Sequence, residues 1–412
     1  MREVSESVYG SAFLRAHAQS ILDFGAGAIS PLGGYGYLDS LGRIDGSKPR
    51  ETYEQARFTH VYALAHLMGF GDYSKQLEEG LRSINSLVRD QVHGGYFSAV
   101  DDNGLPVREE KLCYDHAFVL LAAVAAKSCG VDGASKTFEH VDSVLNKYFW
   151  DEEFSMMKNH WNNDFDVCDS YRGINANMHT VEAYLAAYDV TGDRKYFDRA
   201  YAIAHRAINI IAKGNPAGQW LLPEHFDADW VPDLDFNKDH PADPFRPYGV
   251  TIGHLLEWSR LLLHLHHGLS GVEHEWMIEG ALGLYEVAKK YGWERDGSQG
   301  FVYTIDWDGS VVTASRMWWV VAEAVLTSYC LYRETGEDKY LEDYVKWWKY
   351  IDGHFIDHEN GSWFAELDKD HKVVSHTWSG KPDLYHIFQA AILPLLPPAR
   401  SFIGSAVKFK NQ

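Results

Sequence analysis

One unit of hydrophobic and polar patterning recurs along the whole chain. It begins with a short segment in which aromatic and polar residues alternate, and an Asp, Asn or Gly turn follows, which is typical of a β-hairpin. Six such segments recur at intervals of about 60 to 80 residues: GGYGYLDSLGR (33–43), GGYFSAVDDNG (94–104), EEFSMMKNHWNND (152–164), GQWLLPEHFDADW (218–230), QGFVYTIDWDGS (299–310) and GSWFAELDKDH (361–371). The repeat is the first guide to the architecture.

Between successive hairpins the hydrophobic period changes to that of two helices. The first is strongly apolar, as in LCYDHAFVLLAAVAAKS (112–128), and the second is amphipathic, as in KYFDRAYAIAHRA (195–207). An apolar helix favours an inner position and an amphipathic one an outer position. Six hairpin–helix–helix units therefore predict an all-α fold, a closed (α/α)6 barrel with short β-hairpins at one end, in a single domain over residues 1–412.

Polar and aromatic residues interrupt the first turns of the predicted inner helices. The same ends of all six helices meet at one mouth of a closed barrel, so these residues are predicted to line one pocket. The candidate set is Arg57, Tyr114, Asn175, His179, His254, Glu257, Trp319 and His386. By contrast, His60 and His116 are interpreted as structural histidines, and only one of the adjacent Trp318 and Trp319 is expected to face inward.

Composition and charge narrow the possible partners. Aromatic residues make up 14 %, and rings stack well on sugar faces, although most of them must belong to the core. The net charge of −20 argues against nucleic acid and anionic membranes as partners. The four cysteines form no CxxC, and no apolar stretch reaches the length of a membrane span, so we expect a cytoplasmic protein. Monomer and homo-oligomer both stay open.

Two pairs with His-x-x-Glu spacing, His179/Glu182 and His254/Glu257, admit two interpretations. Such pairs can ligate iron, manganese or zinc. Without a further carboxylate-rich motif we favour acid–base chemistry, in which Glu257 fixes the tautomer or charge of a nearby imidazole, and we expect no metal. A glycosidase with two carboxyls, drawn from Asp115, Glu182 and Asp383, and a sugar-binding protein without activity are the competing classes.

Several segments together resemble the N-acylglucosamine 2-epimerase superfamily, over nearly the whole chain. They are QARFTHVYALA (55–65), YDHAFVLLA (114–122), YRGINANMHTVEAY (171–184), NKDHPADPFRPYGVTIGHLLEWSRLLLHL (237–265), RMWWVVAEA (316–324) and the segment around His386. The resemblance is closest to the aldose–ketose isomerase branch, which acts on mannose or sulfoquinovose. It implies the same barrel, a monosaccharide substrate such as D-mannose or D-lyxose, and no cofactor.

The resemblance also implies roles for the matched residues. His386 would remove the C2 proton of the open-chain sugar, and His254 would assist ring opening. Substrate binding would fall to Arg57, Tyr114, Asn175, His179, Glu257 and Trp319. A 2-epimerase, on mannose/glucose or N-acylglucosamine, would need two bases flanking C2, and two histidines could supply those as well. The residue types therefore leave isomerase and epimerase both open. The segment 229–247 is a candidate lid over the pocket.

Overall fold

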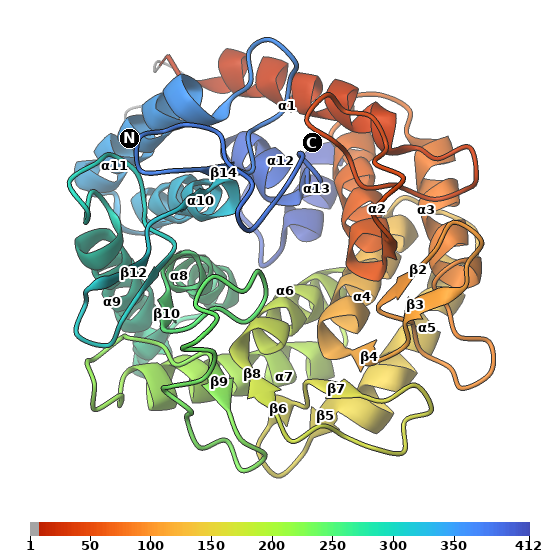
Figure 1. The fold of residues 1–412 in the computed structure, drawn as a ribbon, viewed down its shortest axis with the longest axis horizontal. Helices are drawn as coiled ribbons and strands as arrows, with labels where there is room; N and C mark the ends of the chain where they lie inside the picture. The colour runs from red at the N-terminus through yellow and green to blue at the C-terminus, as the bar shows by residue number, and fades with distance from the viewer. Residues whose placement is uncertain (1–7) are drawn as a thin grey trace.

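Two concentric rings of helices make up the protein (Figure 1), in a computed structural model that describes residues 8–412. The inner ring consists of α2 (Thr52–Leu67), α4 (Cys113–Ser128), α6 (Ile174–Thr191), α8 (Ile252–His266), α10 (Trp318–Thr335) and α12 (Tyr385–Ile392). Each inner helix packs against the next, and α12 packs back on α2, which closes the ring. The predicted (α/α)6 barrel is confirmed.

The outer ring covers the inner one, helix by helix. Its members are α1 (Ser11–Gly25), α3 (Ser74–Ser86), α5 (Ala134–Val144), α7 (Arg194–Ala204), α9 (Glu275–Gly292) and α11 (Asp338–Tyr350). The predicted contrast between the rings is confirmed: every residue of α2 except His66 is buried, whereas α3 buries only one face, which includes Leu77 and Ile84. In residues 8–412, no helix has both the length and the apolarity to span a bilayer.

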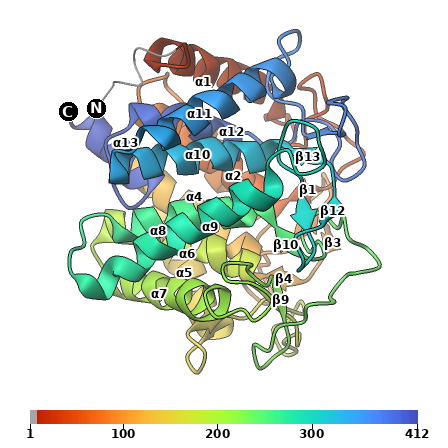
Figure 2. The same ribbon diagram turned by 90° about the vertical axis from the view of Figure 1, so that its left-hand side faces the viewer.

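Short antiparallel strands join successive units at one end of the barrel (Figure 2). Five of them run directly into an inner helix: β1 (Arg50–Glu51), β4 (Lys111–Leu112), β8 (Arg172–Gly173), β10 (Val250–Thr251) and β13 (Arg316–Met317). Each of these pairs with a strand of the following hairpin, respectively β2 (Ala99–Val100), β7 (His160–Trp161), β9 (His225–Phe226), β11 (Thr304–Ile305) and β14 (Glu366–Leu367). The pairing fixes where these inner helices begin, and therefore where their first turns lie.

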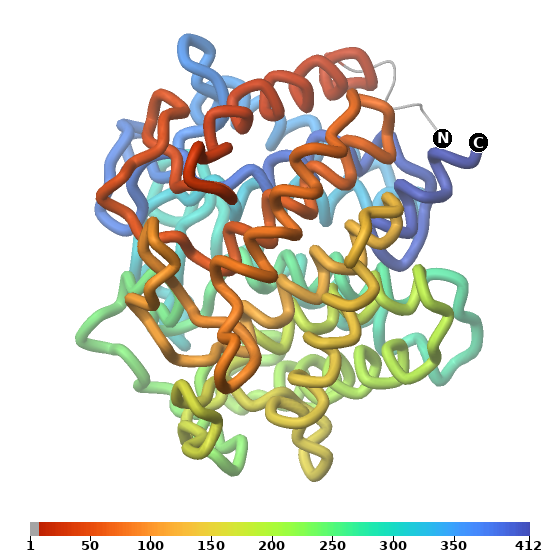
Figure 3. The backbone as a smooth tube through the Cα atoms, turned by 90° about the vertical axis from the view of Figure 1, so that its right-hand side faces the viewer, coloured from red at the N-terminus to blue at the C-terminus, as the bar shows by residue number. Residues whose placement is uncertain are grey.

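The remaining strands complete the hairpins. They are β3 (Pro106–Arg108), β5 (Trp150–Asp151), β6 (Met156–Met157) and β12 (Val311–Thr313). Strand β3 pairs with β2, β5 with β6, and β12 with β11. The hairpin predicted at 33–43 is held only by the isolated bridges Ile29–Tyr35 and Leu38–Ile44. At the opposite end of the barrel, α13 (Phe402–Lys410) packs on α2, α4 and α6 (Figure 3). Access to the barrel interior is therefore expected from the hairpin end.

The two rings approach closely where Gly80 of α3 faces α2. A Cβ at Gly80 would lie 2.1 Å from the Thr59 hydroxyl oxygen, which already donates a hydrogen bond to the Gln55 carbonyl. We expect Gly80→Ala to lower the free energy of unfolding by about 1–2 kcal/mol, because overpacking outweighs the gain of about 1 kcal/mol in helix propensity. Urea unfolding measures the effect. An added Cβ at Gly46 meets nothing within 4 Å, so Gly46→Ala is the matched control; equal stability of both variants would contradict the close approach.

Candidate active site

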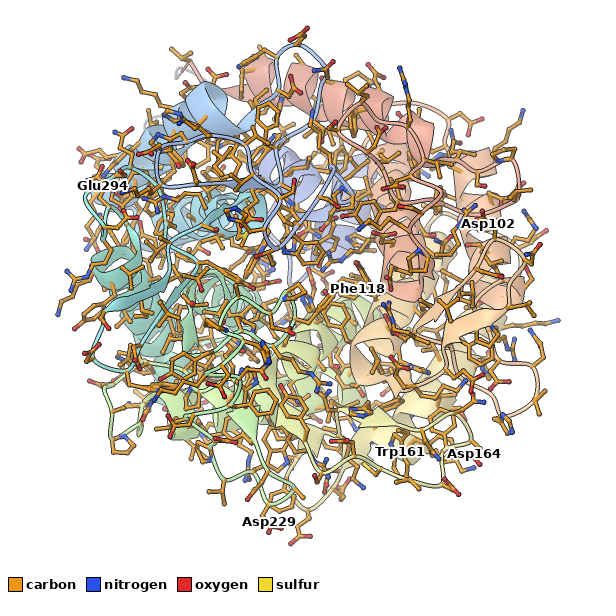
Figure 4. The ribbon with its side chains drawn as sticks, in the orientation of Figure 1. Asp102, Phe118, Trp161, Asp164, Asp229 and Glu294 are labelled. Carbon is orange, nitrogen blue, oxygen red and sulfur yellow. The ribbon has the colours of Figure 1, made fainter. Side chains whose placement is uncertain are left out.

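A single pocket at the hairpin end receives side chains from all six inner helices. It has about 570 Å³ of space not filled by protein atoms, mouth included, and all eight residues predicted from the sequence line it: Arg57, Tyr114, Asn175, His179, His254, Glu257, Trp319 and His386. In Figure 4 the labelled Phe118 lies near the centre of the ring of helices, and its ring centroid is 4.6 Å from that of His179. A pocket lined by polar and aromatic side chains suits a small polar ligand such as a sugar.

Two imidazoles in this pocket are held in the same way, each by a buried carboxylate. Nδ1 of His386 lies 2.9 Å from Glu323 Oε1, and Nδ1 of His254 lies 2.9 Å from Glu224 Oε1. A carboxylate oxygen accepts a hydrogen bond from Nδ1–H, so Nδ1 carries the proton and Nε2 of each ring keeps its lone pair. Within residues 8–412 no hydrogen-bond partner of either Nε2 is recorded, which leaves both nitrogens available as bases.

Trp319 packs against both imidazoles. Its ring centroid lies 5.3 Å from that of His254 and 5.9 Å from that of His386. Gly253 makes this arrangement possible, because a Cβ there would lie 2.2 Å from the indole ring. The indole thus gives both imidazoles an apolar neighbour in the pocket wall. The neighbouring Trp318 also lines the pocket, so the expectation that only one of the two tryptophans faces inward is wrong.

The guanidinium of Arg260 lies behind the pocket and joins three carboxylates from three inner helices. Its nitrogens lie 2.8 Å from Glu323, 3.3 Å from Glu257 and 3.9 Å from Glu182. Arg260 itself is fully buried. Glu323 in turn holds His386. The position of the His386 imidazole therefore depends on the charge of Arg260, which does not line the pocket.

The carboxylates around Arg260 differ in their protonation. Burial would raise the pKa of Glu323, but the Arg260 charge and the His386 hydrogen bond bring it below its ordinary value. Burial would likewise raise the pKa of Glu182, and its contacts with His179 and Arg260 lower it. For Glu257, burial and the nearby Glu323 prevail over Arg260 and raise the pKa well above the ordinary value. The cluster therefore holds ionised Glu182 and Glu323 beside a proton-retaining Glu257.

His179 completes this cluster as a neutral group. Its Nδ1 lies 3.5 Å from Glu182 and 3.8 Å from Glu257. Burial lowers its pKa to about 4, although Glu182 opposes the shift. The imidazole that Glu257 approaches is thus His179, not its sequence neighbour His254, whose carboxylate partner is Glu224.

Two groups of side chains have donor atoms spaced closely enough to hold a metal ion. They are His179/Glu182/Glu257 and Glu257/Glu323/His386, with donors within 4.8 Å of one another in each group. Every carboxylate in both groups already lies within 4 Å of the Arg260 guanidinium. A metal cation would have to share these ligands with a fixed positive charge, so the arrangement favours acid–base chemistry.

Arg57 lies across the pocket in a cage of polar and aromatic groups. It donates to Asp383 at 2.6 Å and to the Tyr114 hydroxyl at 2.8 Å, and its guanidinium lies 4.4 Å from the Phe118 ring centroid. It is thus part of a buried ion pair as well as of the pocket wall. Asp115, another candidate carboxylate, lines an adjoining hollow instead. His116 is structural, as predicted: Nδ1 bonds to the Leu112 carbonyl and Nε2 to the Tyr96 amide.

The sequence did not predict the residues that hold the pocket imidazoles in place, directly or through a further residue. Glu224 lies in a hairpin segment, and Arg260 in an apolar run, so neither has a local pattern that marks it. The pocket wall also includes Tyr303, Trp378 and Phe245 from the connecting segments. Local signals for the cluster are the i,i+3 spacings of His179/Glu182 and Glu257/Arg260, each on one helix.

Comparison with known proteins places this geometry in a family. The pattern that defines N-acylglucosamine 2-epimerase (GlcNAc 2-epimerase) matches residues 33–390. A D-mannose isomerase of Thermobifida fusca is 42 % identical over 96 % of both chains, and one of Pseudomonas cannabina pv. alisalensis is 38 % identical over 90 % of this chain and 89 % of the relative. A crystal structure of D-mannose isomerase superposes with a TM-score of 0.88 at 29 % identity, covering 94 % of this chain and 98 % of the other.

The charge of Arg260 is expected to support the fold as well as the site. Arg260→Met leaves buried carboxylates unpaired and should cost about 3–5 kcal/mol of the free energy of unfolding at neutral pH. Glu182 and Glu323 have lowered pKa values in the fold. Their stabilisation is therefore present above the unfolded glutamate pKa of about 4.3 and is lost as the pH falls through the folded values. The deficit of the variant should thus shrink in acid.

Urea unfolding over a range of pH tests this expectation. Arg43 is exposed, so Arg43→Met serves as the control and should change stability by less than about 0.5 kcal/mol. A deficit for Arg260→Met that does not depend on pH would show that lost packing, and not lost charge, causes it.

Proposed function

The chain belongs to the N-acylglucosamine 2-epimerase family, and from that premise we propose that it is an aldose–ketose isomerase that interconverts D-mannose and D-fructose. The observation that carries the proposal is the pair of imidazoles, each with a carboxylate on Nδ1 and a free Nε2, in one pocket lined by polar and aromatic side chains. The strong similarity to proteins named D-mannose isomerase supports the choice of sugar. D-lyxose/D-xylulose is a second aldose–ketose pair that the same chemistry would serve.

We assign the transfer of carbon-bound protons to His386. Nε2 takes the proton from C2 of the open-chain aldose, the C2 electrons form the C1–C2 double bond, and the carbonyl oxygen O1 gains a proton to give the cis-enediol. The O2 hydroxyl then loses its proton as the C2 carbonyl forms, and C1 receives the proton held on His386. One base on one face of the sugar suffices, because an imidazole can both remove a proton and return it.

We assign ring opening to His254. Nε2 accepts the proton of the anomeric hydroxyl O1, the bond from C1 to O5 breaks, and the same imidazole returns the proton to O5. Glu224 stabilises the imidazolium that exists between the two steps. The negative charge that develops on the enediolate oxygens needs donors, for which Arg57 and the neutral His179 are placed in the pocket wall.

The wall of the pocket supports a monosaccharide substrate. Phe245, from the segment 229–247, packs edge-on against Tyr53, Tyr114 and Trp378, at centroid distances of 5.8, 5.9 and 5.5 Å. A larger hollow adjoins the pocket, and Tyr53, Tyr114, Asn175 and Phe245 line both. Phe245 thus lies where the pocket meets the larger hollow, and the segment that carries it is the candidate lid.

Two alternative functions, a 2-epimerase and a sulfoquinovose isomerase, would make different demands on the pocket. A 2-epimerase would use His254 as the second base at C2, and both imidazoles line the pocket. A sulfoquinovose isomerase would need positive charge for the sulfonate, whereas the Arg57 charge is already paired with Asp383 at 2.6 Å.

We propose a cytoplasmic location, supported by four free cysteines.

Proton NMR of the purified, chelator-treated protein with D-mannose in D₂O tests the proposal. We expect fructose as the product, with deuterium entering at C1 in proportion to exchange of the proton on His386. Glucose as the early product would replace the isomerase by a 2-epimerase. A protein that leaves mannose unchanged would contradict the proposed function.

Variants at the proposed base and its carboxylate separate their roles. His386→Asn should lower kcat roughly 10²–10⁴-fold, as expected for loss of a general base. Glu323→Gln keeps a neutral acceptor on Nδ1 but removes the charge, so we expect a smaller loss in kcat with little change in KM. His358 is exposed on a distant hairpin, and His358→Asn is the control. Equal activity of His386→Asn and His358→Asn would exclude His386 as the base.

A further inference from the structure

Glu54 is a buried acid in the pocket wall that the mechanism above does not use. It is the third residue of α2, only 2 % exposed, and it lines the pocket together with Arg57 and Asp383. Among the described residues, neither of its carboxyl oxygens has a hydrogen-bond partner. Buried polar groups are nearly always hydrogen-bonded, so an acid with two unpaired oxygens beside a pocket points to a partner that the pocket brings.

No neighbour of Glu54 supplies such a partner. The nearest cation, Arg57, donates to Asp383 at 2.6 Å and to Tyr114. The other cation, Arg50, donates to Asp102, to Ser30 and to the Gly33 carbonyl. The charged and titratable groups that act on Glu54 are Arg50 and Glu51 from β1, Tyr53 and Arg57 from α2, Asp383 ahead of α12, and Tyr37 from the first hairpin.

These surroundings favour the protonated form of Glu54. Burial is the largest cause, and the negative charges of Glu51 and Asp383 add to it, so the pKa of Glu54 lies well above its ordinary value although Arg57 and Arg50 oppose the shift. A neutral carboxyl both donates and accepts a hydrogen bond, as a sugar hydroxyl does. An ionised carboxylate at the same place could only accept.

We propose that Glu54, as a neutral carboxylic acid, binds a hydroxyl of the open-chain sugar and makes the pocket selective for uncharged polyols. The inference rests on the proposed function for the kind of ligand. A sulfonate, phosphate or carboxylate substituent near this wall would face Glu54 and Asp383, while the Arg57 charge is already paired. The contact is one of binding, and the proton transfers at C1 and C2 do not pass through it.

Binding of D-mannitol tests the inference without turnover, because this polyol has no carbonyl to isomerise. We expect Glu54→Leu to raise the Kd of mannitol and the KM of mannose about 10-fold with little change in kcat, because one hydrogen bond to a buried group is lost. Glu54→Gln also donates and accepts, so it should restore most of the affinity. Glu78, exposed on α3, supplies the control Glu78→Leu, which should bind like the natural protein.

The pH dependence of mannitol binding separates this role from a purely structural one. In the natural protein, affinity should fall as the pH rises through the raised pKa of Glu54, because the ionised carboxylate cannot donate. In Glu54→Gln that loss should disappear. This comparison does not need the Glu54→Leu variant. Thermal unfolding shows separately whether Glu54→Leu is folded.

Each result bears on the inference separately from the proposed function. Mannitol binding that is unchanged in a folded Glu54→Leu, or the same pH profile for Glu54→Gln and the natural protein, would overturn it. So would a natural protein that does not bind mannitol. A natural protein that binds mannitol but does not isomerise mannose would overturn the proposed function. The mannitol affinities of Glu54→Leu and Glu54→Gln would then still decide the role of Glu54.

Discussion

Three buried glutamates on neighbouring inner helices share the guanidinium of Arg260, and the hydrogen bond that holds His386 depends on this arrangement. Burial alone would protonate Glu323, yet the Arg260 charge keeps it ionised, and only an ionised Glu323 holds the Nδ1 proton of His386 firmly. The same guanidinium supports Glu182, which lies beside His179. One positive charge outside the pocket thus supports the carboxylates beside His386 and His179, whereas His254 depends separately on Glu224.

The barrel makes this cluster possible because its inner helices converge. Strand pairs at the hairpin end fix the starting points of α2, α4, α6, α8 and α10, so their first turns meet around one axis. Polar residues in those turns reach the pocket, and residues one turn further in, such as Arg260 and Glu323, meet behind it. The pocket wall and its supporting charges are therefore successive layers of the same helices.

The sequence predicts the barrel and the pocket residues well because both follow from local patterns. Alternation and helical period mark the units, and Arg57 or His386 stands out as a polar interruption of an apolar helix. Contacts between distant segments leave no such mark. Glu224 reaches His254 across 30 residues, and Glu323 reaches His386 across 63, so their roles appear only when the ring closes. The prediction that only one of Trp318 and Trp319 faces inward was wrong for the same reason, because a loop residue, Trp378, packs against Trp318.

The central claim is that carboxylates fix His254 and His386, the two imidazoles that we propose as catalytic, with the proton on Nδ1 and the lone pair on Nε2. Nitrogen NMR of protein labelled with ¹⁵N-histidine measures this directly at alkaline pH, where the rings are neutral, with His254→Asn and His386→Asn used to assign the signals. The account predicts the Nδ1–H tautomer for both rings, and a change in the His386 signal when Glu323 is replaced by Gln. An Nε2–H tautomer for either ring in the natural protein would contradict the account, because the nitrogen facing the sugar could then not act as a base.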